Sequence, residues 1–182
     1  MPRLRLVLPA LALALVLAVP AGASAACKGA RQHPSAHNMK AIRHATLCLL
    51  NGQRHRHGLG KLRAQRTLAK VATRYSRLMV RKGFFAHVSP TGSTMVGRVR
   101  RTGYLHGASR WSLGENLAWG AGRSATPAQI VRAWMRSPGH RRNILDASFR
   151  EIGIGIVRGA PRRAGAARAA ATYTTEFGHR RR

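Results

Sequence analysis

Acidic residues are almost absent from this 182-residue chain, which has four Asp and Glu against 33 Lys and Arg and a formal net charge of +29 at pH 7. One of the four, Glu115, lies in the sequence SLGENLAWG (residues 112–120), in a turn-like Gly-Glu-Asn between apolar residues. An ordinary loop carboxylate paired with an arginine is one interpretation. The other is that the chemistry of a site requires a carboxylate at this position.

Several catalytic motifs are missing as well. The chain has no HExxH, no GxSxG and no Cys nucleophile beside a His, which removes the usual sequence signatures of those hydrolase classes. It has no internal repeats. No nucleic-acid recognition motif accompanies the positive charge, so nucleic acid is a disfavoured partner. The charge indicates attraction to an anionic envelope polymer or to lipid head groups, and solvated arginines typical of an Arg-rich proteome are the alternative.

The one long apolar run lies at the N-terminus. Arg3 and Arg5 precede this run, which covers residues 6–19, and the small-residue sequence ASAA follows it. This order is typical of a secretory signal peptide over residues 1–26. The run is short for a membrane span of about 20 residues, so we expect cleavage and no transmembrane span in the mature chain.

Cysteine is scarce. The two cysteines, Cys27 and Cys48, do not have the CxxC spacing of a metal site. An even pair in an exported protein predicts one disulfide. Lipid attachment at Cys27, which would make the chain a lipoprotein, is the less favoured alternative, because a lipobox normally has a larger aliphatic residue at the position of Ser24.

The remaining chain is long enough for one domain with a hydrophobic core. We divide it into a linker over residues 27–37, a domain over residues 38–179 and a basic tail over residues 180–182. We expect a monomer that is secreted or associated with the cell envelope.

Helical periodicity dominates the first part of this domain. Apolar residues spaced three and four apart predict helices over residues 38–51 and 64–82, and Gly83 ends the second. Ser93 is expected to cap a short helix. Thr126 and Pro127 have the signature of a further helix start.

Strand periodicity follows at the end of the chain. The sequences EIGIGIV (residues 151–157) and TYTTEFG (residues 172–178) both alternate with period two. We predict two antiparallel strands joined by a long mobile loop. Gly153 and Gly155 remove side chains from one face, so another element can approach closely there. Helices first and strands last predict an α+β fold, with helices packed over a small antiparallel sheet.

Three residues beside Gly- and Pro-rich loops could carry chemistry: His87 in FFAHVSPTG, Glu115 in GENLAWG and His140 in SPGHRRNIL. Two imidazoles and one carboxylate can bind a divalent metal. They can equally act as an acid/base pair around a water molecule. Their spacing in sequence does not show that they meet in the fold.

Five motifs in this order, FFAHVSPTG, GENLAWG, AWMRSPGHRRNIL, IGIGI and TYTTEFG, resemble the bacterial secreted branch of the CAP superfamily (cysteine-rich secretory proteins, antigen 5 and pathogenesis-related proteins, with an SCP domain). The resemblance covers residues 40–178. It implies an α-β-α sandwich and a surface cleft lined by two His and two acidic residues, which in some members holds zinc or another divalent metal. By motif, His87 and Glu115 match cleft residues.

The chain departs from the eukaryotic pattern at two cleft positions. Ser137 lies near the place of the second cleft Glu, and Thr172 matches the last cleft His. The bacterial branch instead carries a His in Ser-Pro-Gly-His, which is His140 here. The resemblance therefore implies a metal or acid/base set of His87, Glu115 and His140. The other expected cleft-lining residues are Ser89, Asn116, Trp119, Ser137 and Thr172.

Three functions remain open from the sequence. We favour a secreted binding module that engages an anionic envelope polymer or lipid through the cleft and the basic surface. A structural or protein-interaction domain with a vestigial cleft is the second. A weak hydrolase that depends on a divalent metal such as zinc is the third, because one anionic ligand compensates a divalent charge poorly. The sequence thus leans away from an enzyme without excluding one.

Overall fold

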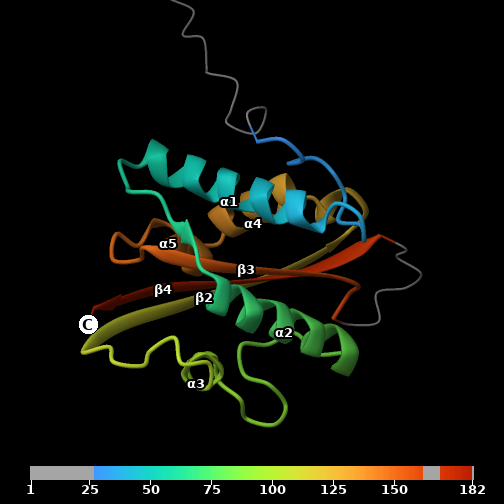
Figure 1. Ribbon diagram of the computed structural model, residues 1–182. Coiled ribbons are helices and arrows are strands. Elements are labelled where there is room, and N and C mark those ends of the chain that lie inside the picture. Colours follow the sequence, from blue (N-terminus) through green and yellow to red (C-terminus); the bar gives the residue numbers. More distant parts are fainter. Residues whose placement is uncertain (1–26, 162–168, 182) are drawn as a thin grey trace, which may run out of the picture.

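A four-stranded sheet forms the middle layer of a three-layer sandwich. This structure, a computed structural model, describes residues 27–161 and 169–181. The strands are β1 (Arg63–Ala64), β2 (Arg110–Ala121), β3 (Glu151–Arg158) and β4 (Ala170–Arg181), in the spatial order β1-β3-β4-β2. One face is covered by α1 (Met39–Arg56), α4 (Pro127–Arg136) and α5 (Pro138–Leu145), and the other by α2 (Arg66–Lys82) and α3 (Met95–Arg100), as Figure 1 shows. A 3-10 turn, η1 (Gly122–Ala125), follows β2. The predicted α-β-α sandwich is confirmed.

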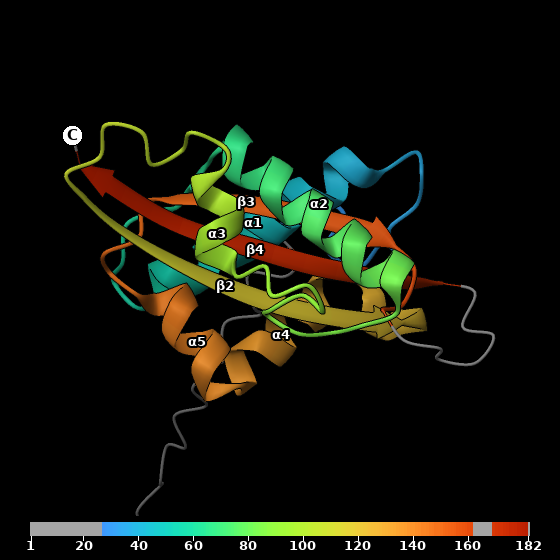
Figure 2. The ribbon, with the colours of Figure 1, turned by 90° about the horizontal axis from the view of Figure 1, so that it is seen from below.

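The helix α2 lies directly on β3, and two glycines make this approach possible (Figure 2). A Cβ on Gly153 or Gly155 would lie closer than 3.0 Å to the main chain of α2, a distance that real Cβ atoms do not show. The predicted close approach is therefore confirmed, and α2 is its partner. Gly83 ends this helix in the left-handed conformation, with φ of 67°, as predicted.

The isoleucines of β3 point to the other face and form the main core with α1, α4 and α5. Ile152, Ile154 and Ile156 are buried there together with Trp134. The indole Nε1 of Trp134 donates a hydrogen bond to the carbonyl of Leu117, 3.0 Å away. This contact satisfies the one polar atom of the buried ring and joins α4 to β2.

The segment containing Glu115 differs from the sequence-based expectation. Gly-Glu-Asn is not a turn but the middle of β2, which pairs with β4 at every residue from Arg110 to Ala121. Local turn propensity is overridden by this long-range pairing. Gly114 is needed because the ring of Phe149 packs against it, 2.9 Å from where a Cβ would be.

Several boundaries also differ. The short helix α3 is capped by Thr94, whose Oγ1 accepts a hydrogen bond from the N–H of Gly97, and not by Ser93. The sheet is not purely antiparallel, since β1 pairs in parallel with Glu151 and Ile152 of β3. β4 continues to Arg181, into the segment expected to be a basic tail.

The disulfide between Cys27 and Cys48 is formed, as predicted. It ties the start of the described chain to α1. The predicted signal peptide (residues 1–26) and most of the predicted loop between β3 and β4 (residues 162–168) lie outside the described residues. Among the helices that the structure describes, none has the length and apolarity needed to cross a membrane.

A buried arginine shows how the fold accommodates its excess of positive charge. Arg54 at the end of α1 is 1% exposed. Its guanidinium donates hydrogen bonds to the carbonyls of Gly60, Ile144, Asp146 and Phe149. Burial lowers the pKa of Arg54. Main-chain carbonyls here take the place of a carboxylate, and they fasten the turn after α5 to α1.

Candidate functional site

The edge strand β2 carries the carboxylate of the site. Glu115 lies in the middle of this strand, and its side chain is 2% exposed. The loop after α2 brings His87 over it. This loop is held by the hydroxyl of Tyr75, which donates to the carbonyl of Ala86 at 2.7 Å. The short helix α3 brings Arg98 to the same place.

Both oxygens of the Glu115 carboxylate are engaged. Oε1 lies 2.8 Å from Nδ1 of His87 and Oε2 lies 2.5 Å from Nη2 of Arg98. A carboxylate can only accept hydrogen bonds, so Nδ1 of His87 carries the proton. The imidazole side chain is 57% exposed, and its free Nε2 is the part of this pair that a ligand can reach.

The buried side chain of Arg98 holds the parts of the site together. Its guanidinium lies 3.3 Å from the centre of the Tyr75 ring. Nη1 donates to the carbonyls of His87 and Ser93, at 3.1 and 2.8 Å. One buried side chain therefore holds both the carboxylate and the loop that carries His87. Sequence reasoning did not find Arg98, since nothing distinguishes it locally from the other arginines.

A second carboxyl group lies against Glu115. Glu176 is its cross-strand neighbour on β4 and is 0% exposed. Burial raises the pKa of Glu176 well above its ordinary value, and the charge of Glu115 raises this pKa further, while the nearby Arg98 opposes the shift. Within residues 27–161 and 169–181, neither oxygen of Glu176 has a hydrogen-bond partner. A carboxyl group that is buried beside a carboxylate and lacks hydrogen bonds keeps its proton, so Glu176 is a neutral acid next to Glu115.

Sequence reasoning missed Glu176 as a site residue, although a signal was present. The alternation in TYTTEFG places it on the same face as Thr172 and Thr174. One of only four acids in the chain, on the inner face of a central strand, is as unusual as Glu115.

Replacing Glu176 by glutamine is expected to stabilise the protein at neutral pH but not at low pH. The unfolded chain ionises Glu176 above pH of about 4.5, whereas the folded chain keeps the proton, so native stability falls by up to about 1.4 kcal/mol per pH unit until the raised pKa is reached. Glutamine has nearly the same size and does not titrate. Urea unfolding of both proteins between pH of about 4 and 8 measures the difference. A difference that does not change with pH would contradict the assignment of a neutral acid.

His140 lies on the opposite side of the β2 edge, at the start of α5. Its carbonyl accepts from Nδ2 of Asn116 at 3.0 Å, and the Asn116 carbonyl oxygen accepts from Asn143 at 2.8 Å. Burial lowers the pKa of His140, and the nearby His87 lowers it further. His140 therefore contributes a neutral imidazole beside the cluster, and Asn116 positions it through the main chain.

The other expected cleft residues have separate places. Ser89 is buried, and its hydroxyl accepts from the N–H of Ser93 and contacts Thr91, within its own loop. Ser137 lies between α4 and α5. Trp119 and Thr172 are partners in the β2–β4 register, four residues along the strands from Glu115 and Glu176, which is about 13 Å. The structure brings His87 and Glu115 into contact and leaves Trp119 and Thr172 apart from them.

Comparison with known proteins decides the family. The model of the cysteine-rich secretory protein family, CAP, matches residues 47–175. The chain belongs to the CAP family. The Bacillus subtilis protein YkwD is 39% identical to this CAP domain over 109 residues, which are 60% of this chain and 40% of YkwD.

Solved structures agree with the assignment. An extracellular protein containing an SCP domain from Bacillus anthracis shares 26% identity and has a TM-score of 0.59, covering 79% of this chain and 44% of that one. An outer surface protein of Borrelia burgdorferi, 19% identical, shows the same fold with a TM-score of 0.64 over 82% of this chain and 99% of its own. This CAP chain thus spans less than half the length of YkwD and of the Bacillus anthracis protein.

The site of this CAP domain does not fit a divalent metal in the arrangement found. The guanidinium of Arg98 already provides the positive charge beside Glu115, and the remaining oxygen of Glu115 is taken by His87. Within the described part of the chain, no three His, Cys, Asp or Glu side chains lie close enough together to share a metal ion. The geometry instead makes a hydrogen-bonded set in which Arg98 holds Glu115 and Glu115 holds the exposed imidazole of His87.

Proposed function

We propose that this CAP domain is an exported binding module that engages an anionic component of the cell envelope, an acidic wall polymer or a lipid head group, through the surface around His87. Relatives described as extracellular and outer-surface proteins support a location outside the cytoplasm. The formal charge of +29 supports an anionic ligand.

One observation carries the proposal: the site contains no free anion. Glu115 is neutralised by Arg98 and hydrogen-bonded to His87, and Glu176 keeps its proton. What remains at the surface is the exposed imidazole of His87. The exposed cation Arg101 of α3 lies beside the same loop, because its Nη2 donates to the hydroxyl of Ser93 at 2.8 Å. Such a surface attracts phosphates and carboxylates, and its interior carboxylate positions the imidazole instead of repelling the ligand.

Binding to poly(glycerol phosphate) and to phosphatidylglycerol vesicles tests this function, with phosphatidylcholine vesicles as the neutral reference. We expect affinity for one of the anionic ligands that falls at least about tenfold between about 50 and about 200 mM salt. His87→Ala is expected to weaken binding several-fold. The matched variant His55→Ala, at an exposed histidine of α1, should bind like the native chain.

The outcomes separate the alternative functions. If neither anionic ligand binds, or if the affinity does not depend on salt, the proposal of an anionic ligand is wrong and a protein-interaction role is favoured. If the His87→Ala and His55→Ala variants bind equally well, the ligand binds elsewhere on the protein surface and not around His87.

A further inference from the structure

The outer edge of β3 is open beyond its first two residues. β1 pairs only with Glu151 and Ile152, and the N–H of Gln65 donates to the carbonyl of Ile152 at 2.9 Å just before α2 begins. Main-chain groups two residues apart point to the same side of a strand. The N–H and C=O of Ile154 therefore point toward the same open side, where the described chain provides no further strand.

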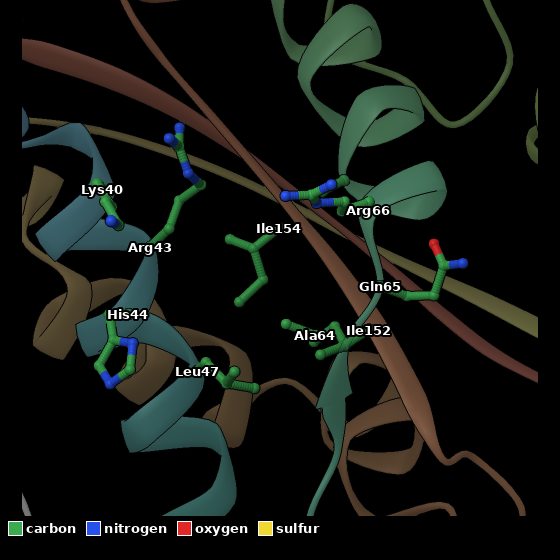
Figure 3. Close-up of a pocket in the computed structure, with 10 residues that line it drawn as sticks. Lys40, Arg43, His44, Leu47, Ala64, Gln65, Arg66, Ile152 and Ile154 are labelled. Atoms are coloured by element: carbon green, nitrogen blue, oxygen red, sulfur yellow. The ribbon is translucent and has the colours of Figure 1, made fainter.

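A hollow lies at this open edge, between α1 and α2 (Figure 3). We call it the α1–α2 groove. Its volume is about 230 Å³, and a second hollow of about 530 Å³ adjoins it, since both include Arg43, Arg66 and Ile154. The floor is apolar and consists of Leu47, Ala64, Ala69, Ile152 and Ile154.

Both walls of the groove are basic. Lys40 and Arg43 line it from α1, and Arg66, Lys70 and Arg74 line it from α2. No acidic residue lines either hollow. In residues 27–161 and 169–181, none of these five cations forms an ion pair. The groove thus combines an unpaired sheet edge with an uncompensated positive charge on each side of it.

We propose that the α1–α2 groove binds an extended acidic peptide segment of another protein, which adds to the sheet as a strand along β3. Such a strand would take up the main-chain groups of β3 beyond Ile152. Its side chains would alternate between the α1 wall and the α2 wall, so carboxylates on either face of the strand meet cations.

An anionic lipid satisfies this groove less well. Its head group could contact the cations, but it would leave the main-chain groups of the sheet edge without partners. A second copy of this chain is disfavoured, because basic walls on both copies would repel each other, a common protection of exposed edges. The same charges therefore select against self-association and for an acidic partner.

The groove is independent of the site proposed above. The strand order β1-β3-β4-β2 places it at the β3 edge, whereas His87 and Glu115 lie at the β2 edge. A variant of one surface should leave the other unchanged.

Fluorescence anisotropy with a labelled peptide tests the proposal. The probe is an alternating Glu-Thr peptide of about six residues, the length of a typical strand, added to the purified full chain. We expect saturable binding to the native chain and none with the corresponding Lys-Thr peptide. The charge reversal Arg43→Glu with Arg66→Glu should weaken binding at least about tenfold. Arg132→Glu with Arg136→Glu, at exposed positions of α4, makes the same change of net charge elsewhere and should have a much smaller effect.

Two further measurements test the strand pairing and the independence of the groove. A peptide of the same charge with N-methylated main-chain amides cannot donate to β3, so it should bind at least about tenfold more weakly. His87→Ala should bind the Glu-Thr peptide like the native chain. Three results would each overturn the proposal. The methylated peptide could bind as tightly as the unmethylated one, or the two charge-reversal pairs could bind the peptide equally well. The third is that the peptide does not bind while vesicles bind at this groove.

Discussion

Replacing Gly155 by alanine is expected to destabilise the native fold by more than about 3 kcal/mol, which exceeds the usual cost of an extra methyl group in a core. The added Cβ would overlap the main chain of Ala72 and Thr73 in α2. A flexible side chain could rotate away from such a contact, but a helix backbone cannot. Relief therefore requires α2 to move off β3, with loss of the packing that joins these elements.

Chemical unfolding followed by circular dichroism measures this effect, and the chain offers a matched control. Gly60 has no atom within 4 Å of the place of a Cβ and does not have positive φ. Gly60→Ala should therefore leave stability within about 0.5 kcal/mol of the native value. Gly153→Ala should behave like Gly155→Ala, since its Cβ would overlap the main chain of Leu68 and Ala69. A native-like stability of both β3 variants would show that α2 packs differently.

The Arg98→Leu variant is expected to lose about 3–5 kcal/mol of stability, the usual cost of removing one partner of a buried ion pair. Leucine would leave the Glu115 carboxylate buried without its cation, beside the carboxyl of Glu176. It would also remove the hydrogen bonds to the carbonyls of His87 and Ser93. The loop that carries His87 should then become more mobile.

A second substitution separates the charge from the packing. Combining Arg98→Leu with Glu115→Gln removes the uncompensated carboxylate, so the double variant should regain part of the lost stability, a coupling that a double-mutant cycle measures. Arg100→Leu, at an exposed position on the same helix whose guanidinium lies 5.7 Å from the Trp111 ring, should cost about 1 kcal/mol or less. An Arg98 variant no less stable than the Arg100 variant would contradict the central place of the ion pair.

Features that depend on neighbours in the chain could be predicted from the sequence. The period-two glycines of β3 indicated a close approach, and Gly83 indicated the end of α2, because each depends on the local backbone. The even number of cysteines, together with an N-terminus that resembles a secretory signal peptide, predicted the disulfide. The order of motifs predicted the family and, through it, the three-layer fold. It also led us to expect His87 and Glu115 in one site, and the structure brings these two side chains into contact.

Only the tertiary structure decided how Glu115 is surrounded. The sequence predicted Gly-Glu-Asn to be a turn, but these residues lie in a strand. The pairing of β2 with β4 joins residues about sixty positions apart, so it cannot be recognised from the local sequence. The same pairing puts Glu176 against Glu115, and helix α3 delivers Arg98 to both. Burial keeps the proton on the carboxyl group of Glu176, and one of the 33 basic residues, Arg98, forms an ion pair with Glu115. Both features depend on this shared interior, because local sequence determines neither which side chains are buried nor which charges lie together.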